Sequence, residues 1–358
     1  MARHKKKSLF TRKKVSKRKP TTKIGIPADS EWKSLAQFGS FLVDDDEGNQ
    51  HKFNLNETAF ILPPGLLPDQ KHHPTAYWIG RIKEIRARNP EDVCLAQPRN
   101  YLRSLTQVWA LVQWFWSPHE VATVIKSFDV SNCGQYERIY SDYHDYVSTA
   151  SFCDHATVKS YDERSLDQEP FDDDYFFRRY DLEYRARRIF PNVSKSACIC
   201  GVSYNPDRDQ VMHFCSRPTC CLAFHQECLL MYKQYESSTA ARARRLLECW
   251  PDTDKRLSVE TLIRRGKGSG YSMSDPLHEF PEELLQTAQQ QIVKGVQAGG
   301  VVGNVRSVVA ARRLIYKTLI EGSTLPIDWM SQVDVDTAIH LQDEGFSVYL
   351  CPECQSAI

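Results

Sequence analysis

The strongest constraint on the fold is a set of eight cysteine and histidine residues in short, regular spacings. In chain order they are Cys198, Cys200, Cys215, Cys220, His225, Cys228, Cys351 and Cys354. One or two intervening residues in Cys-x-Cys, His-x-x-Cys and Cys-Pro-x-Cys let each pair hold one ion from a tight turn. Seven thiolates and one imidazole make two tetrahedral sets, the closed coordination that structural zinc prefers. The sequence therefore predicts two Zn²⁺ ions, with no open coordination position for catalysis.

Cysteine content and composition indicate a folded protein of a reducing compartment. The 358 residues include twelve cysteines, and 41% are apolar and 25% charged, which excludes a wholly disordered chain. The first thirty residues are cationic where a secretory signal would be apolar, and no run of about 18 apolar residues could cross a bilayer. We therefore expect a protein that is neither secreted nor membrane-bound, in which clustered cysteines bind metal.

Positive charge is concentrated at the N-terminus. Residues 1–23 hold eleven Lys and Arg and no acid, whereas the remaining residues carry 35 bases and 45 acids. We expect residues 1–29 to be a disordered basic tail, because like charges repel and almost nothing in the segment can pack. Such a tail predicts either a nuclear-import signal or a contact with DNA.

Residues 30–192 show the short alternating runs that are typical of β-strands. Over 108–116, period-two alternation places on one face Val108, Ala110, Val112, Trp114 and Trp116. Over 76–85, it places on one side Trp78, Gly80, Ile82 and Glu84. Loops rich in Gly and Pro separate the runs. We predict a mostly-β domain over 30–192 that closes wholly or partly into a barrel.

Helical spacing dominates residues 229–350, which separate Cys228 from Cys351. One helix face would carry Val305, Val308, Ile315 and Leu319, interleaved with Arg306, Arg312, Arg313 and Lys317. Residues 240–247 and 282–293 are further helix candidates. The prediction is an α+β multidomain protein whose metal-binding domain, 193–358, contains a helical insertion at 229–350.

The order of four cysteines, one histidine and three cysteines resembles a PHD finger. Cys220 lies five positions before His225, Phe224 precedes that histidine, and Tyr349 stands two positions before the last ligand pair, as in the family. The resemblance implies an interleaved arrangement. One zinc ion would be held by Cys198, Cys200, His225 and Cys228, and the other by Cys215, Cys220, Cys351 and Cys354.

This PHD-like segment departs from the family pattern in two ways. Some 122 residues separate Cys228 from Cys351, so the finger would be split by an insertion, which loop-closure entropy tolerates because it grows only logarithmically with length. Ala223 occupies the position where methyl-lysine-binding PHD fingers commonly place Trp, so the finger's role would be structural, or binding of an unmodified tail or a protein. Cys221 is an alternative ligand to Cys220.

Three motifs of the predicted β domain, in this order, resemble a BAH domain. They are Trp78-Ile79-Gly80-Arg81-Ile82, Trp114-Phe115-Trp116-Ser117-Pro118 and the Ser141-Asp142 turn after Ile139. A BAH domain followed by a PHD finger is similar to plant and fungal chromatin readers. The resemblance implies a barrel fold and a role in chromatin.

The BAH resemblance also implies a ligand site. Residues matching the methyl-lysine cage of the family are Trp78, Trp114 and Trp116, and Asp142 matches an acid near the peptide groove. Aromatic faces attract a quaternary ammonium, which cannot donate hydrogen bonds. Acidic runs at 44–47 and 172–174 would steer a basic histone tail towards the site. The alternative is that the three tryptophans belong to the core, as Trp109 and Phe115 on the opposite face are expected to do.

The leading hypothesis is a nuclear, non-enzymatic reader of a methylated histone H3 tail on the nucleosome. By resemblance, the mark would be trimethylation of lysine twenty-seven, linked to transcriptional repression through chromatin-modifying complexes. One alternative is a RING-like zinc finger acting as a ubiquitin ligase, which would need an exposed apolar patch beside the finger. Another is a DNA-binding chromatin adaptor that uses the basic tail and the arginine-bearing helix over 305–319.

Overall fold

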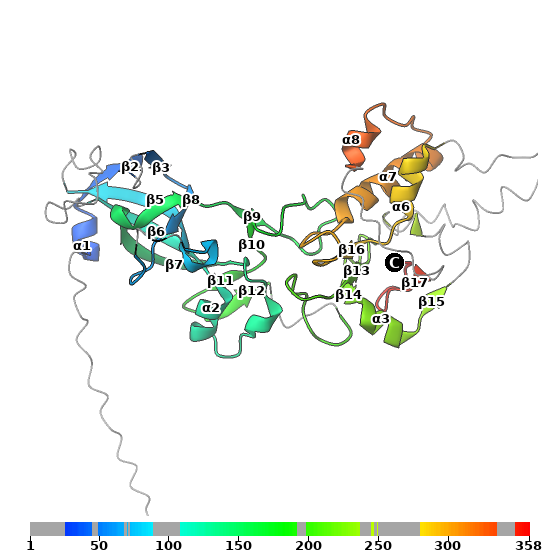
Figure 1. Ribbon diagram of the computed structural model, residues 1–358, viewed down its shortest axis with the longest axis horizontal. Helices are drawn as coiled ribbons and strands as arrows, with labels where there is room; N and C mark the ends of the chain where they lie inside the picture. The colour runs from blue at the N-terminus through cyan, green and yellow to red at the C-terminus, as the bar shows by residue number, and fades with distance from the viewer. Residues whose placement is uncertain are drawn as a thin grey trace, which may run out of the picture.

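The structure is a computed structural model, and its elements form two parts that lie side by side (Figure 1). It describes residues 26–44, 49–67, 70, 72–88, 108–191, 198–236, 245–246, 249, 280–334 and 348–358. We call residues 26–191 the β module and residues 198–358 the metal module. The predicted basic tail, apart from residues 26–29, and the predicted boundary near residue 192 lie outside the described residues.

The β module consists of twelve short strands and a few single-turn or two-turn helices among its described residues. The strands are β1 (Ala36–Phe38), β2 (Ser40–Asp44), β3 (Gln50–Asn54), β4 (Thr58–Ile61), β5 (Trp78–Ala87), β6 (Val108–Trp116), β7 (Ile139–Ser148), β8 (Phe152–His155), β9 (Val158–Ser160), β10 (Phe176–Arg178), β11 (Asp181–Glu183) and β12 (Arg188–Phe190). The helices are α1 (Asp29–Trp32), η1 (Pro74–Ala76), α2 (Pro118–Val124), η3 (Val130–Asn132) and η4 (Thr149–Ser151).

Most of these strands join one sheet, in the order β12-β11-β7-β6-β5-β4-β8 with β1 on the outer part of β5. The β2–β3 hairpin packs across one face through Phe41 and Phe53, which contact Phe152 of β8 edge to face. The sheet and the hairpin together enclose the core, which confirms the mostly-β prediction. The buried residues of this core include Ile82, Ile85, Ala87, Val108, Ala110, Val112 and Trp114.

A bulge modifies the predicted alternation on β5. The pairing with β6 shifts between Ile82 and Glu84, so Ile82 and Ile85 both face the core, while Glu84 accepts a hydrogen bond from the Trp32 indole at 3.1 Å. A bulge adds one residue to a strand and reverses the side on which the later residues point. The predicted face therefore holds from Trp78 to Ile82 and changes beyond it.

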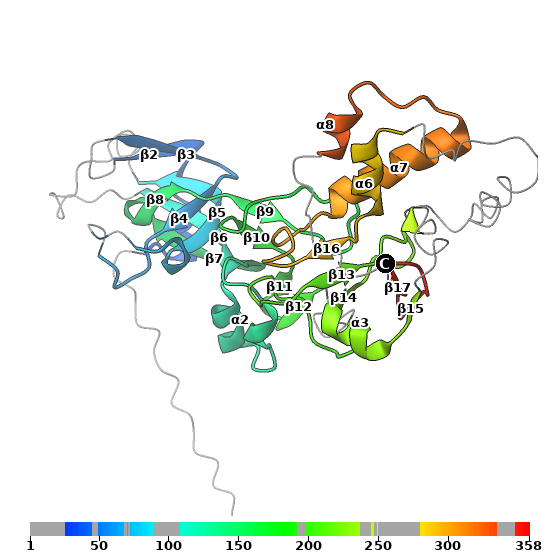
Figure 2. The ribbon, with the colours of Figure 1, turned by 45° about the vertical axis from the view of Figure 1, so that its right-hand side comes forward.

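The metal module contains short strands and three helices of at least seven residues among its described residues. Its elements are β13 (Met212–Phe214), β14 (Ala223–His225), α3 (Gln226–Tyr232), β15 (Tyr235–Glu236), α6 (Glu282–Gln289), β16 (Val293–Lys294), α7 (Val305–Glu321), α8 (Trp329–Val333) and β17 (Val348–Tyr349). Helices α6, α7 and α8 lie together above the small sheet, whose strand order is β14-β13-β16 (Figure 2). Among the described helices, none combines the length and the apolar character needed to span a bilayer.

The predicted insertion at 229–350 is not purely helical. The predicted helix over 282–293 ends at Gln289, and Val293–Lys294 forms β16, which pairs with β13 beside β14. Strand β17 pairs with β15, so the end of the insertion lies beside its beginning. Helix α7 matches the prediction over 305–319, while most of the candidate helix at 240–247 lies outside the described residues.

The two modules meet at a buried ion cluster centred on Arg179. Its guanidinium donates to both carboxylate oxygens of Glu137 at 2.9 and 2.6 Å, pairs with Glu163, and donates to the Tyr204 carbonyl at 3.0 Å. Burial by itself lowers the pKa of Arg179, but the carboxylates of Glu137 and Glu163 raise it well above its ordinary value, so the guanidinium stays charged. Tyr204 belongs to the metal module, so this cluster joins the modules.

Replacing Glu137 tests how much this cluster stabilises the fold. We expect Glu137→Gln to lower the free energy of unfolding by about 3–5 kcal/mol, because it leaves a buried guanidinium incompletely compensated. The measurement is urea-induced unfolding of the full chain. The matched control is Glu183→Gln, which removes an exposed pair with Arg188 and should cost less than about 1 kcal/mol. Equal losses in both variants would contradict the assignment.

Candidate functional site

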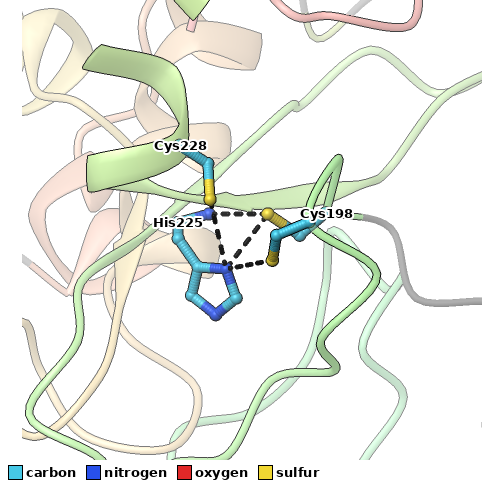
Figure 3. Close-up of side chains that lie close together, drawn as sticks. Cys198, His225 and Cys228 are labelled. Atoms are coloured by element: carbon cyan, nitrogen blue, oxygen red, sulfur yellow. Dashed lines mark hydrogen bonds between the residues drawn. The ribbon is translucent and has the colours of Figure 1, made fainter. Parts of the chain in front are cut away.

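The first metal cluster consists of Cys198, Cys200, His225 and Cys228, whose ligand atoms all lie within 4.8 Å of one another. His225 ends β14 as the N-cap of α3, and Cys228 lies in the first turn of that helix, so the two side chains lie close together (Figure 3). Cys198 and Cys200 come from a turn in which the Gly201 amide donates to the Cys198 carbonyl at 2.9 Å. The Nδ1 atom of His225 faces all three sulfurs, at 3.0, 3.4 and 3.9 Å.

The second metal cluster consists of Cys215, Cys220, Cys351 and Cys354, also within 4.8 Å of one another. Sulfur atoms lie 3.6 Å apart in the pair Cys215–Cys354 and 3.7 Å apart in Cys220–Cys351. The last two ligands sit in a turn closed by the Gln355 amide, which donates to the Cys351 carbonyl at 2.9 Å. Cys351 and Cys354, which follow the insertion, therefore lie beside Cys215 and Cys220, which precede it, as predicted.

Both clusters have the dimensions that a tetrahedral ion requires. Bonds of zinc length separate two sulfur ligands by roughly 3.8 Å, and sulfur from nitrogen by roughly 3.6 Å. The observed separations, 3.6 and 3.7 Å between sulfurs and 3.0 to 3.9 Å from sulfur to nitrogen, scatter around these values. Each cluster can hold one metal ion, with four protein atoms as ligands.

The structure distinguishes between Cys220 and its neighbour Cys221. Cys220 belongs to the second cluster, whereas the Cys221 Sγ lies against the Arg217 carbonyl at 3.4 Å. Burial, followed by the adjacent Cys220 sulfur, raises the pKa of the Cys221 thiol to about 11. Cys221 therefore remains a neutral thiol beside the cluster, and the preferred assignment of Cys220 agrees with the geometry.

Two of the three predicted cage tryptophans meet on the sheet. Trp78 begins β5 and is 37% exposed, while Trp114 on β6 is 9% exposed. Their rings lie 5.5 Å apart between centroids at an interplanar angle of 75°, so the two indoles form a nearly perpendicular corner. Trp114 also packs into the core of the β module. It therefore has both the core contacts of the alternative interpretation and the contact with Trp78 that the cage prediction requires.

Gly80 makes the close packing beside this corner possible. A Cβ atom at Gly80 would lie 2.1 Å from Cγ1 of Val112 and 3.4 Å from Cε3 of Trp114. The small residue in the motif that follows Trp78 is therefore required so that these side chains can rest against the backbone of β5.

The third predicted cage residue, Trp116, packs with two tyrosines. Its ring lies 6.0 Å from Tyr143 at 87° and 5.5 Å from Tyr184 at 49°. Trp116 and Tyr143 also pack against the core that contains Trp114. Tyr143 lies next to the predicted Asp142, but Tyr184 had no sequence signal, because its position depends on the pairing of β11 with β7.

Carboxylates lie beside these rings. Asp142 is exposed, and its Oδ1 accepts a hydrogen bond from the Tyr184 amide at 2.7 Å, which holds the carboxylate in place. Burial, and then the nearby Asp145 carboxylate, raises the pKa of Tyr143, so its ring stays uncharged. Of the predicted steering acids, 45–47 lie outside the described residues, and Asp173 instead accepts a hydrogen bond from the Val301 amide at 3.2 Å.

The arginines of α7 bind other parts of this chain. Arg312 is buried and donates to the carbonyls of Ala288 and Gln290. Arg313 pairs with Asp167, and Arg306 lies 3.6 Å from a carboxylate oxygen of Glu169. These contacts engage most of the positive charge that the DNA-binding hypothesis placed on this helix.

These observations define a protein with a β-rich module joined to a module that can hold two metal ions. No protein-family model matches the chain, and no curated protein matches it either. Among solved structures, the chain is similar to the BAH domain of yeast Rsc2, with 9% sequence identity and a TM-score of 0.26. The match covers 42% of this chain and 52% of that one, so the chain spans about half the length of that structure.

Paired serine variants test the ligand assignment of the second cluster. We expect Cys220→Ser to lose the ion of this cluster and to keep the ion of the first, because a hydroxyl is a poor substitute for a thiolate. Cys221→Ser should keep both. The measurement is the zinc-to-protein ratio of the purified full chain, determined by elemental mass spectrometry. Loss of metal in Cys221→Ser but not in Cys220→Ser would contradict the assignment.

Proposed function

We propose that the chain is a nuclear, non-enzymatic chromatin reader whose β module binds a methylated histone H3 tail. The observation that carries the proposal is the corner formed by the exposed Trp78 and the largely buried Trp114, whose rings stand at 75° with centroids 5.5 Å apart. On this proposal the β module is of the BAH type, and the metal module is a PHD-type finger that holds two Zn²⁺ ions.

The corner suits a trimethylammonium group because two perpendicular rings can each turn a negative face towards the same cation. A trimethylammonium has no proton to donate, so aromatic faces are its best partners, and Trp is the strongest of them. The second perpendicular pair, Trp116 and Tyr143 at 87°, would supply further walls. The Asp142 carboxylate, held by the Tyr184 amide, would attract the positive charge of a histone tail.

On this proposal, the metal module has a structural or protein-binding role and no catalytic role. Each ion would have four protein ligands, which leaves no position for an activated water. Ala223, half-buried on β14, provides no aromatic wall, so we assign the methyl-lysine site to the β module. The module would then act as a scaffold and as a surface for a second protein contact.

We propose trimethylation of lysine twenty-seven of histone H3 as the mark, with transcriptional repression as the outcome. This choice rests on the resemblance of the motif order to plant and fungal BAH–PHD readers. Recruitment of chromatin-modifying complexes to the nucleosome would follow from binding. The basic tail would serve nuclear import or contact DNA.

Specific exposed apolar residues favour a second candidate, a RING-like ubiquitin ligase. Beside the first metal cluster, Ile199 is 50% exposed, and on α3 Leu230 and Met231 are 54% and 72% exposed. Exposed apolar side chains of this kind could receive a ubiquitin-conjugating enzyme. Self-ubiquitylation of the full chain that is abolished by Leu230→Ala, but not by Met330→Ala in α8, would support this function over reading alone.

Removing one indole tests the reader directly. We expect Trp78→Ala to weaken binding of a trimethylated H3 peptide by about tenfold or more, since the loss of a desolvated cation–π contact costs about 2 kcal/mol. Trp78→Phe should retain part of the affinity. Isothermal titration calorimetry with the zinc-loaded full chain is the measurement, and the unmodified peptide is the ligand control.

The matched protein control is Phe190→Ala, which removes another exposed aromatic residue of the β module. It should bind as tightly as the wild type. Absence of binding to any methylated peptide, or equal affinity of Trp78→Ala and the wild type, would dismiss the reader function.

A further inference from the structure

A segment of the β module lies between the sheet and the metal module. Figures 1 and 2 both place β9 and β10 in the middle of the molecule, between the large sheet and the metal-binding part. Tyr161 and Phe177 of this segment are buried in one cluster with Met212, Val301 and Val302 of the metal module. The two modules therefore share an apolar core.

Lys294 connects this segment to the strand that precedes a metal ligand. Its Nζ donates to the Tyr161 hydroxyl at 3.2 Å and to the Glu163 carbonyl at 2.9 Å. The same ammonium lies 4.4 Å from the ring centroid of Phe214, the residue before Cys215 in the second metal cluster. Lys294 is 2% exposed and lies on β16, which pairs with β13.

The connection continues to the strand that carries the proposed ligand site. The Glu163 carboxylate pairs with Arg179, and Arg179 holds both carboxylate oxygens of Glu137. Glu137 lies two residues before β7, the strand that carries Asp142 and Tyr143. A series of contacts, buried except at the partly exposed Glu163 carboxylate, thus runs from the residue before Cys215 to Glu137, and β7 continues from there to Asp142 and Tyr143.

We propose that Lys294 and Arg179 are positioning residues that couple metal loading of the metal module to the aromatic site on β6 and β7. The proposal rests on the proposed function for the identity of the ligand, although the coupling itself does not require it. Metal binding orders β13 and β16, so Lys294 and Glu163 take their places and Arg179 holds Glu137 at the start of β7. Because coupling is reciprocal, a bound peptide would also raise the metal affinity.

Hydrogen exchange of the full chain measures the coupling without any peptide. On removal of zinc with a chelator, we expect the amides of β7 to exchange about 5- to 150-fold faster, the range of typical coupling free energies. The β2–β3 hairpin, which packs on the core face of the sheet, serves as the internal reference and should change less. Unchanged exchange of β7 on zinc removal would overturn the proposal.

Variants separate coupling from a general loss of stability. Lys294→Met should still bind two zinc ions, but zinc removal should change the exchange of β7 by no more than about twofold, the scatter expected for independent sites. Lys294→Arg should restore the response in part. The matched control is Lys159→Met, an exposed lysine on β9, which should respond as the wild type does.

Three further outcomes are informative. If Lys294→Met does not fold, Glu163→Gln, which removes the charge that pairs with Arg179 but keeps the carbonyl that accepts from Lys294, should reduce the response, and a full response would overturn the coupling. If the wild type shows coupled exchange but binds no methylated peptide, the proposed function fails and the coupling stands. If peptide binds equally well with and without zinc, the coupling fails and the reader function stands.

Discussion

The arrangement of the whole molecule depends on one buried guanidinium. Arg179 is compensated by Glu137 and Glu163 and by the Tyr204 carbonyl, which come from both modules. An ionised group in an apolar interior costs several kcal/mol unless its partners are all in place. Separation of the modules would expose this cluster and the apolar side chains around Tyr161, so the modules are expected to fold and to move as one body.

The second metal cluster explains how a long insertion is accommodated. It takes Cys215 and Cys220 from before the 122-residue segment and Cys351 and Cys354 from after it, and the β15–β17 pairing brings the two ends together. The entropic cost of closing a long loop is little more than that of closing a short one. The binding free energy of an ion held by four protein ligands would be far larger than this difference. The insertion also contributes to the metal module, because its strand β16 completes the small sheet and carries Lys294.

Sequence reasoning recovered what depends on local spacing. The eight residues of the two clusters were predictable because their chemistry and spacing act over a few residues, and α7 and β6 followed from periodicity. Features set by distant partners were not predictable: the bulge after Ile82, the strand within the predicted helix at 282–293, and the ring of Tyr184 beside Trp116. The burial of Arg179 and Lys294 could not be predicted from the sequence, because the residues that compensate their charges lie far along the chain.

The proposed function depends on the aromatic corner of Trp78 and Trp114. Gly80 makes room for Val112 beside this corner, and β7 supplies the neighbouring acid and ring, Asp142 and Tyr143. The most direct test is nuclear magnetic resonance of the zinc-loaded full chain with an H3 peptide whose lysine N-methyl groups are labelled. The account predicts nuclear Overhauser effects between these methyl groups and the indole protons of Trp78 and Trp114. A bound peptide whose methyl groups show contacts only to other residues would contradict it.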